Sequence, residues 1–118
     1  MPTVDRTRLT SLVERERATY TATHPVAATL NRSATHLLRG VPMTWMAKWS
    51  GGFPLYLDSA SGNRVIDVDG HEYVDFALGD TGAMAGHSPR PTVEAVSERL
   101  RRGITAMLPT ADAEWAPS

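Results

Sequence analysis

The stretch from Phe53 to Phe76 decides the fold of this chain, and it reads F-P-L-Y-L-D-S-A-S-G-N-R-V-I-D-V-D-G-H-E-Y-V-D-F. Three short runs with alternating apolar residues are separated by Ser61-Gly62-Asn63 and by Asp69-Gly70. Glycine, asparagine and aspartate tolerate the backbone angles that tight reversals need. The stretch therefore predicts a three-stranded antiparallel meander that begins near Leu55.

The alternation also predicts that this sheet has one buried face. In the third strand, Val74 and Phe76 share one face, whereas Tyr73 and Asp75 share the other. A sheet of this size is only marginally stable in water by itself. We therefore expect a helix or another domain to pack against it.

A glycine-rich loop follows the third strand and contains Gly79, Gly82 and Gly86. Glycines at this density allow the backbone to approach a ligand or another chain closely. Ser88-Pro89-Arg90-Pro91 then predicts the start of a helix, with Ser88 as its N-cap. Gly103 loosens or ends that helix. The apolar face of this predicted helix comprises Val93, Val96, Leu100 and Ile104.

The first forty residues predict two amphipathic helices that meet at Thr23-His24-Pro25. The apolar face of the first contains Leu9, Leu12 and Val13. The second is expected to extend to Gly40, and its apolar positions are Val26, Leu30, Ala34, Leu37 and Leu38. Each helix must bury its apolar face against something else.

The bulk composition excludes several classes of function. A length of 118 residues suits one modest domain, and a net charge of −1 gives no reason to expect nucleic acid or an anionic membrane as a partner. The chain has no cysteine, so it forms no disulfide framework. No apolar leader or membrane-length run is present in the sequence, so we expect a cytoplasmic protein.

In the meander, the glycine-rich loop and the segments that flank them, the sequence resembles the class III aminotransferases, which depend on pyridoxal phosphate (PLP). Within that class it is most similar to the glutamate-1-semialdehyde aminomutase branch and its β-amino-acid transaminase relatives. The resemblance covers about Ser33 to Trp115. It is carried by Gly40-Val41, Pro54-Leu55-Tyr56-Leu57, D-V-D-G-H-E-Y-V-D-F over 67–76, Gly86-His87-Ser88-Pro89 and Met107-Leu108-Pro109-Thr110.

The resemblance implies an α+β fragment, the N-terminal part of a fold-type I PLP-dependent transferase. Residues 1–39 would form a helical N-terminal arm, and residues 40–118 a small-sheet and loop-helix segment. The large cofactor domain of such enzymes lies later in the chain. Because relatives are homodimers with active sites at the subunit interface, the resemblance implies either a homodimer or a complementing cofactor-domain chain.

The activity that the resemblance implies is transfer of an amino group between an amino acid or amine and a carbonyl acceptor, by transaminase or aminomutase (isomerase) chemistry. PLP catalysis needs a lysine amine to hold the coenzyme. The one lysine, Lys48, precedes the meander and matches no catalytic position. We therefore assign no catalytic or cofactor-binding residue and expect this chain alone to be inactive. It is then either a fragment or one subunit of a split enzyme.

A rival hypothesis of another class is a non-catalytic dimerisation module, or a degenerate homologue, that associates through its helical arm. An enzyme needs a lysine and a carboxylate from another segment or chain, whereas a module does not. The sequence alone leaves both hypotheses open.

Four residues are candidates for contact with a small-molecule amino donor. Trp45 and Met46 occupy the segment that touches substrate in relatives, and they suggest an apolar pocket wall unless they simply pack in the core. Asp80 and Thr81 lie in the glycine-rich loop. Asp80 either bonds a substrate ammonium or caps the loop locally.

The histidines predict no metal site. His24, His36, His71 and His87 lack the close spacing that is typical of metal ligands. We expect His87 to be structural, because the sequence places no nucleophile or carboxylate to work with it.

Overall fold

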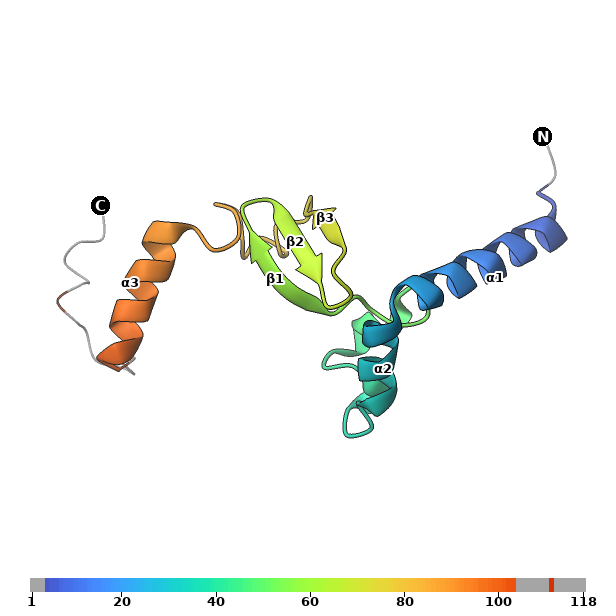
Figure 1. Cartoon of the computed structure of the whole chain (residues 1–118), viewed down its shortest axis with the longest axis horizontal. Coiled ribbons are helices and arrows are strands. Elements are labelled where there is room, and N and C mark those ends of the chain that lie inside the picture. The colour runs from blue at the N-terminus through green and yellow to red at the C-terminus, as the bar shows by residue number, and fades with distance from the viewer. Residues whose placement is uncertain (1–3, 104–110, 112–118) are drawn as a thin grey trace.

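The computed structural model describes residues 4–103 and residue 111, and it is elongated (Figure 1). Its radius of gyration is 20.4 Å, whereas a compact domain of about this length has a radius near ~13 Å. The elements in chain order are α1 (Arg6–Thr23), α2 (Pro25–Ser33), the 3₁₀ turns η1 (Leu38–Gly40) and η2 (Thr44–Lys48), β1 (Leu57–Ser61), β2 (Arg64–Asp67), β3 (Glu72–Val74) and α3 (Arg90–Arg101).

The predicted meander is confirmed, with strand order β1-β2-β3 and antiparallel pairing throughout. Val65 pairs with Ala60 on one side and with Tyr73 on the other. Gly62 and Gly70 turn the chain with φ of 57° and 87°, as expected for tight reversals. The strands are shorter than the alternation suggests, because β1 begins at Leu57 and β3 ends at Val74.

The expected buried face of the sheet is wrong for this structure. Val74 is 37% exposed and Phe76 is 91% exposed. The reason is visible in Figure 1, where α1 and α3 extend from opposite ends of the sheet rather than covering it. Within the described residues, the buried apolar side chains are only Ala27, Ala28, Val41, Pro54 and Ala83.

The helical arm contains both expected helices, but the second is shorter than the apolar spacing predicts. Asp5 caps α1 by accepting a 3.0 Å hydrogen bond from the Arg8 amide. The helix α2 ends at Ser33, not at Gly40. The chain reverses at Arg39 (φ 60°), and the Asn31 side chain donates to the Gly40 carbonyl at 3.2 Å. This folding back of 34–40 removes Leu37 and Leu38 from the helix.

The helix α3 forms as predicted, although Ser88 is not its N-cap. That position belongs to Pro89, and no side chain caps the helix. Ser88 adopts φ 52° and donates from its hydroxyl to the Ala60 carbonyl at 3.2 Å, which ties this segment to β1. Gly103 follows the helix with φ 86°. Ile104 and the Met107–Thr110 motif lie outside the described residues.

The apolar side chains of α3 are about half exposed at Val93, Val96 and Leu100. Among the described elements, α3 contacts no other helix or strand. Its amphipathic face is therefore uncovered in this structure. In the described part of the chain, no helix has the length and apolar character needed to cross a bilayer.

The glycine-rich loop is clamped onto the first turn of the sheet. Gly62 and His87 exchange two backbone hydrogen bonds of 2.9 and 2.7 Å. Gly86 lies directly beside this bridge, and a Cβ at Gly86 would lie 3.2 Å from the Gly62 Cα. The bridge therefore depends on a residue without a side chain at Gly86.

Gly86→Ala is expected to weaken this clamp more than the matched change Gly70→Ala. The two glycines have nearly identical φ (88° and 87°), but a Cβ at Gly70 meets nothing within 4 Å. Both variants carry the left-handed backbone strain, and only Gly86→Ala adds the clash with Gly62. We expect a further loss of about 1 kcal/mol in local opening free energy, measured by hydrogen exchange of the Gly62 amide. Equal losses would contradict the steric account.

Candidate functional site

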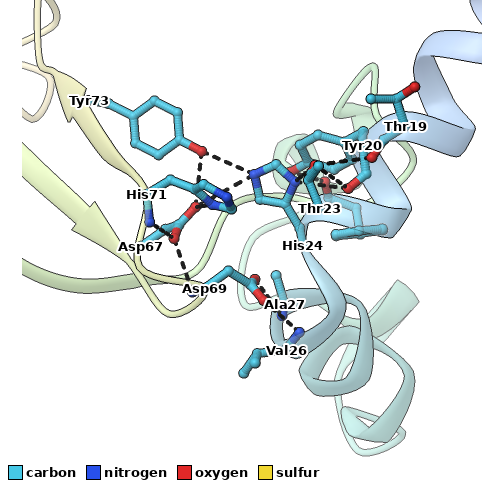
Figure 2. A network of polar contacts seen from close by, with 11 residues as sticks. Thr19, Tyr20, Thr23, His24, Val26, Ala27, Asp67, Asp69, His71 and Tyr73 are labelled. Carbon is cyan, nitrogen blue, oxygen red and sulfur yellow. Dashed lines mark hydrogen bonds and ion pairs between the residues drawn. The ribbon is translucent and has the colours of Figure 1, made fainter.

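A polar cluster joins the arm to the sheet, and it consists of His24, Asp67, His71 and Tyr73 (Figure 2). We call it the junction cluster. His24 separates α1 from α2, and Asp67 ends β2. His71 lies just before β3, and Tyr73 lies within it. His24 and Tyr73 lie 49 residues apart in the chain, yet their side chains are 3.0 Å apart. The cluster is therefore a tertiary contact rather than a local turn.

Asp67 is the centre of the cluster, and its side chain is only 3% exposed. Its Oδ1 accepts hydrogen bonds from the Asp69 amide at 2.9 Å and the His71 amide at 2.8 Å. Its Oδ2 accepts from His71 Nδ1 at 3.1 Å and from the Tyr73 hydroxyl at 3.0 Å. One oxygen thus shapes the β2–β3 turn, while the other faces the arm.

These contacts set the charge of the cluster. Burial raises the pKa of Asp67, but hydrogen bonds from His71, Tyr73 and the Asp69 amide outweigh it and leave the pKa below its ordinary value of 3.8. Burial and the bond to Asp67 raise the pKa of Tyr73 to about 12. At neutral pH, Asp67 is therefore a carboxylate and Tyr73 keeps its proton.

His24 brings the arm into this cluster with a defined tautomer. Its Nδ1 lies 2.8 Å from the Tyr20 carbonyl oxygen, which can only accept, so Nδ1 carries a proton. Its Nε2 faces the Tyr73 hydroxyl at 3.0 Å and Asp67 Oδ2 at 3.6 Å. The ring also packs against Tyr20, with centroids 4.2 Å apart. The buried imidazole is thus held from both sides.

Asp69 makes a second connection between the sheet and the arm. Its carboxylate accepts from the Val26 amide at 2.7 Å and the Ala27 amide at 3.0 Å. Those amides are at the N-terminus of α2, whose own N-cap residue, His24, makes no side-chain capping bond. An anion at a helix N-terminus is favourable. The β2–β3 turn therefore caps α2 from outside.

A second carboxylate, Asp75, organises the glycine-rich loop. Its Oδ1 accepts from the Ala77 and Leu78 amides at 2.8 and 3.0 Å. Its Oδ2 accepts from the Gly79 amide at 3.2 Å and lies 2.7 Å from His87 Nε2. The expectation that no carboxylate lies beside His87 is therefore wrong. Asp75 caps the loop through these bonds, a role that the sequence left open for Asp80.

Acid is expected to open this loop. The bond from His87 lowers the pKa of Asp75 below its ordinary value of 3.8; burial opposes this, and the loop amides add to the lowering. Because the folded-state pKa is the lower one, the carboxylate stabilises the loop above pH 3.8, and this contribution is lost as the pH falls through the folded-state pKa. Hydrogen-exchange protection of the Gly79 amide should therefore fall as the pH is lowered from 3.8 through the folded-state pKa of Asp75. Asp75→Asn should lack this dependence, and unchanged protection of the wild-type loop in acid would contradict it.

Three of the four candidate substrate residues, Trp45, Asp80 and Thr81, are exposed, Met46 is half-buried, and no side-chain contact among the described residues brings the four together. Trp45 and Met46 belong to η2, and Trp45 is 58% exposed, so it does not pack in a core. Asp80 and Thr81 are exposed on the loop with φ of 53° and 75°. Their roles in substrate contact stay predictions.

A groove of about 540 Å³ runs along α1. It is lined by one face of the helix and by the segment after η2, with Leu12, Val13, Tyr20 and Trp49 among its walls. Lys48 lies just before this segment, is exposed, and does not line the groove. No described contact joins its amine to a carboxylate. That this chain does not hold PLP covalently stays a prediction.

Sequence reasoning missed the junction cluster, the Asp69 cap and the Asp75–His87 pair. The sequence places Asp69 in a tight turn and gives the histidines no metal-ligand spacing, and neither pattern indicates these contacts. One signal was available. Asp67, His71, Tyr73 and Asp75 supply a set of polar side chains to a meander that also carries apolar ones, and such polar sets need partners when buried.

Comparisons with known proteins agree with the meander and arm described above. No protein-family model matches the chain. The crystal structure of a glutamate-1-semialdehyde aminomutase from Pseudomonas aeruginosa PAO1 superposes with a TM-score of 0.84 and 44% identity, over 95% of this chain and 25% of that chain. A variant of that enzyme with the same match was solved in complex with PMP.

Curated relatives give the same result by sequence. The glutamate-1-semialdehyde 2,1-aminomutase of Syntrophus aciditrophicus is 43% identical over 61 residues, 51% of this chain and 14% of that protein. The enzyme of the same name from Chloroflexus aurantiacus is 30% identical over 102 residues, 86% of this chain and 21% of that protein. The chain is thus a partial match to the glutamate-1-semialdehyde aminomutases and the class III aminotransferases, and it spans at most about a quarter of these relatives' length.

Proposed function

We propose that this chain supplies the N-terminal arm and small sheet of a PLP-dependent aminotransferase or aminomutase. Such an enzyme moves an amino group between an amino acid or amine and a carbonyl acceptor. The observation that carries the proposal is the 44% identity and 0.84 TM-score over 95% of the chain to an aminomutase structure. Residues 1–39 act as the arm and residues 40–118 as the small-sheet and loop-helix segment.

The shape of the molecule supports a role within a larger assembly. The chain is elongated, its sheet is uncovered, and the apolar residues of α1 and α3 are exposed. Exposed apolar faces of this kind are typical of protein–protein contact. We propose that they are covered by a second copy of the chain or by a complementing chain that carries the cofactor domain.

The role of the chain in the reaction is to frame the site rather than to hold the coenzyme. When bound to such an enzyme, PLP supplies the electron sink for amino-group transfer. Lys48 is exposed and does not line the α1 groove, which supports covalent attachment by another segment or chain. Trp45 and Met46 would contribute an apolar wall, and Asp80 and Thr81 would contribute polar groups on the glycine-rich loop. The chain alone would be inactive.

A chimaera tests this proposal. The matching quarter of the Pseudomonas aeruginosa aminomutase would be replaced by this chain, and aminomutase turnover and the coenzyme absorption would be measured. We expect the chimaera to bind PLP and to retain measurable turnover, because the fold and the junction cluster are supplied intact. A matched chimaera with Asp67→Ala should lose much of both. A folded chimaera that binds PLP but shows no turnover would overturn the proposal.

A second candidate, a non-catalytic dimerisation module, is favoured by one observation. The helix α1 lines an apolar groove, and its Leu9, Leu12 and Val13 are exposed. This candidate predicts a concentration-dependent dimer of the chain together with an inactive chimaera. Sedimentation of the pure chain, read beside the chimaera's turnover, separates the two functions.

A further inference from the structure

We propose that His24, Asp67 and His71 form a binding site for a divalent transition-metal ion, with Zn²⁺ as the natural occupant, that joins the arm to the sheet. One ligand atom from each residue lies within 4.8 Å of the others. Asp67 Oδ2 is 3.1 Å from His71 Nδ1 and 3.6 Å from His24 Nε2. In a tetrahedral zinc site with bonds near ~2.0 Å, ligand atoms are about 3.3 Å apart. The two pairs that include Asp67 bracket that separation, and the two histidine nitrogens lie within 4.8 Å of each other.

The side chains of His24 and Asp67 also have the orientation that is typical of metal ligands. A ligating histidine usually donates its second ring N–H to a carbonyl or carboxylate, which fixes the tautomer. His24 does so, since its Nδ1 contacts the Tyr20 carbonyl at 2.8 Å, and its Nε2 faces the cluster (Figure 2). The Asp69 and His71 amides hold Asp67 Oδ1 and so aim Oδ2 at the same point.

The proton balance around this point favours a cation. His24 Nε2, Asp67 Oδ2 and the Tyr73 hydroxyl surround one position, and the hydroxyl lies 3.0 Å from each of the other two atoms. Tyr73 has one proton and donates it to Asp67 Oδ2. The His24 Nε2 lone pair that faces this hydroxyl can therefore bind a metal ion while Tyr73 stays a hydrogen-bond donor to Asp67.

His71 completes the site and gives access to it. Its side chain is 39% exposed, whereas those of His24 and Asp67 are buried. On binding, His71 would present the Nδ1 lone pair to the metal and carry its proton on Nε2. Two neutral imidazoles and one carboxylate suit Zn²⁺ and leave a fourth position for water. Because the ligands come from the arm and from both ends of the β2–β3 turn, the ion would stabilise the arm–sheet junction.

Calorimetric titration of the chelator-treated full chain with ZnCl₂ tests the proposal. We expect one ion per chain, binding at least ten-fold weaker in His71→Ala, and unchanged binding in His36→Ala, a matched change at an exposed histidine outside the cluster. His71→Ala is preferred to His24→Ala because His71 is half exposed, and circular dichroism checks that the variant folds.

Co²⁺ supplies an independent measurement. A tetrahedral nitrogen and oxygen site should give the chain intense visible absorption with Co²⁺, and His71→Ala should lose it. Histidine ring resonances of His24 and His71, but not His36, should shift when Zn²⁺ binds. Failure to bind one ion per chain, or equal binding by wild type, His71→Ala and His36→Ala, would overturn the proposal and leave adventitious histidine binding only.

Discussion

Replacing Asp67 with alanine is expected to release the arm from the sheet. The change removes the acceptor of two amides, one imidazole and one phenol in a site where the carboxylate is almost fully buried. Removing one partner of a buried charged network typically costs 3 kcal/mol or more, since the remaining polar groups lose their partners. We expect a loss of about 3 kcal/mol in the local opening free energy of the junction.

Native-state hydrogen exchange of the Ala28 and His71 amides measures this loss. Ala28 reports on α2 and His71 on the turn, so both sides of the junction are followed. Asp58→Ala is the matched control, because it removes an exposed carboxylate from β1 in the same sheet. If Asp67→Ala and Asp58→Ala left exchange at both amides equally protected, the junction cluster would not be what joins the arm to the sheet.

Gly51→Ala is expected to have the second-largest effect, because it displaces the ring of Tyr20. A Cβ at Gly51 would lie 2.5 Å from Tyr20 Cδ1 and 2.6 Å from Cε1. The ring cannot swing away freely, since it packs against His24 and Phe53, with centroids 4.2 and 4.9 Å away. Overpacking of this kind costs about 2 kcal/mol. The loss should appear as faster exchange of the His24 amide, which bonds the Tyr20 carbonyl.

A double-mutant cycle gives the control for this prediction. In a Tyr20→Ala background, the space beside Gly51 is empty, so adding Gly51→Ala should cost little. Backbone strain does not add to the measured cost of Gly51→Ala, because Gly51 does not have a positive φ. A cost for Gly51→Ala that is the same in both backgrounds would show that contact with Tyr20 is not its cause.

The meander could be predicted because its determinants are local. Alternating β-branched residues favour strands, and Gly62 and Gly70 take up the positive φ that their turns need. The end of α2 could not be predicted, because apolar spacing continues through Leu38 while the chain has already turned back. The reversal depends on a bond from Asn31 to the Gly40 carbonyl, which no periodic pattern indicates.

The site was harder to predict than the fold because its contacts connect distant segments. Asp67 has the local sequence of a turn residue, and it performs that role through Oδ1. Its second role, through Oδ2 toward His24, arises only when the arm is placed against the sheet. The pairing of Asp75 with His87 likewise needs the loop to close on Gly62. The expected buried face of the sheet is exposed, because alternation indicates which side chains share a face but not whether another element covers that face.

If these residues frame a coenzyme site without holding the coenzyme, trapping with borohydride should leave Lys48 unmodified. The pure chain would be incubated with PLP, reduced, and digested for mass analysis of the peptide that contains Lys48. We expect no specific coenzyme mass on Lys48 and no conversion of an amino donor to its carbonyl product. A stoichiometric reduced adduct on Lys48, with turnover by the unaccompanied chain, would contradict it.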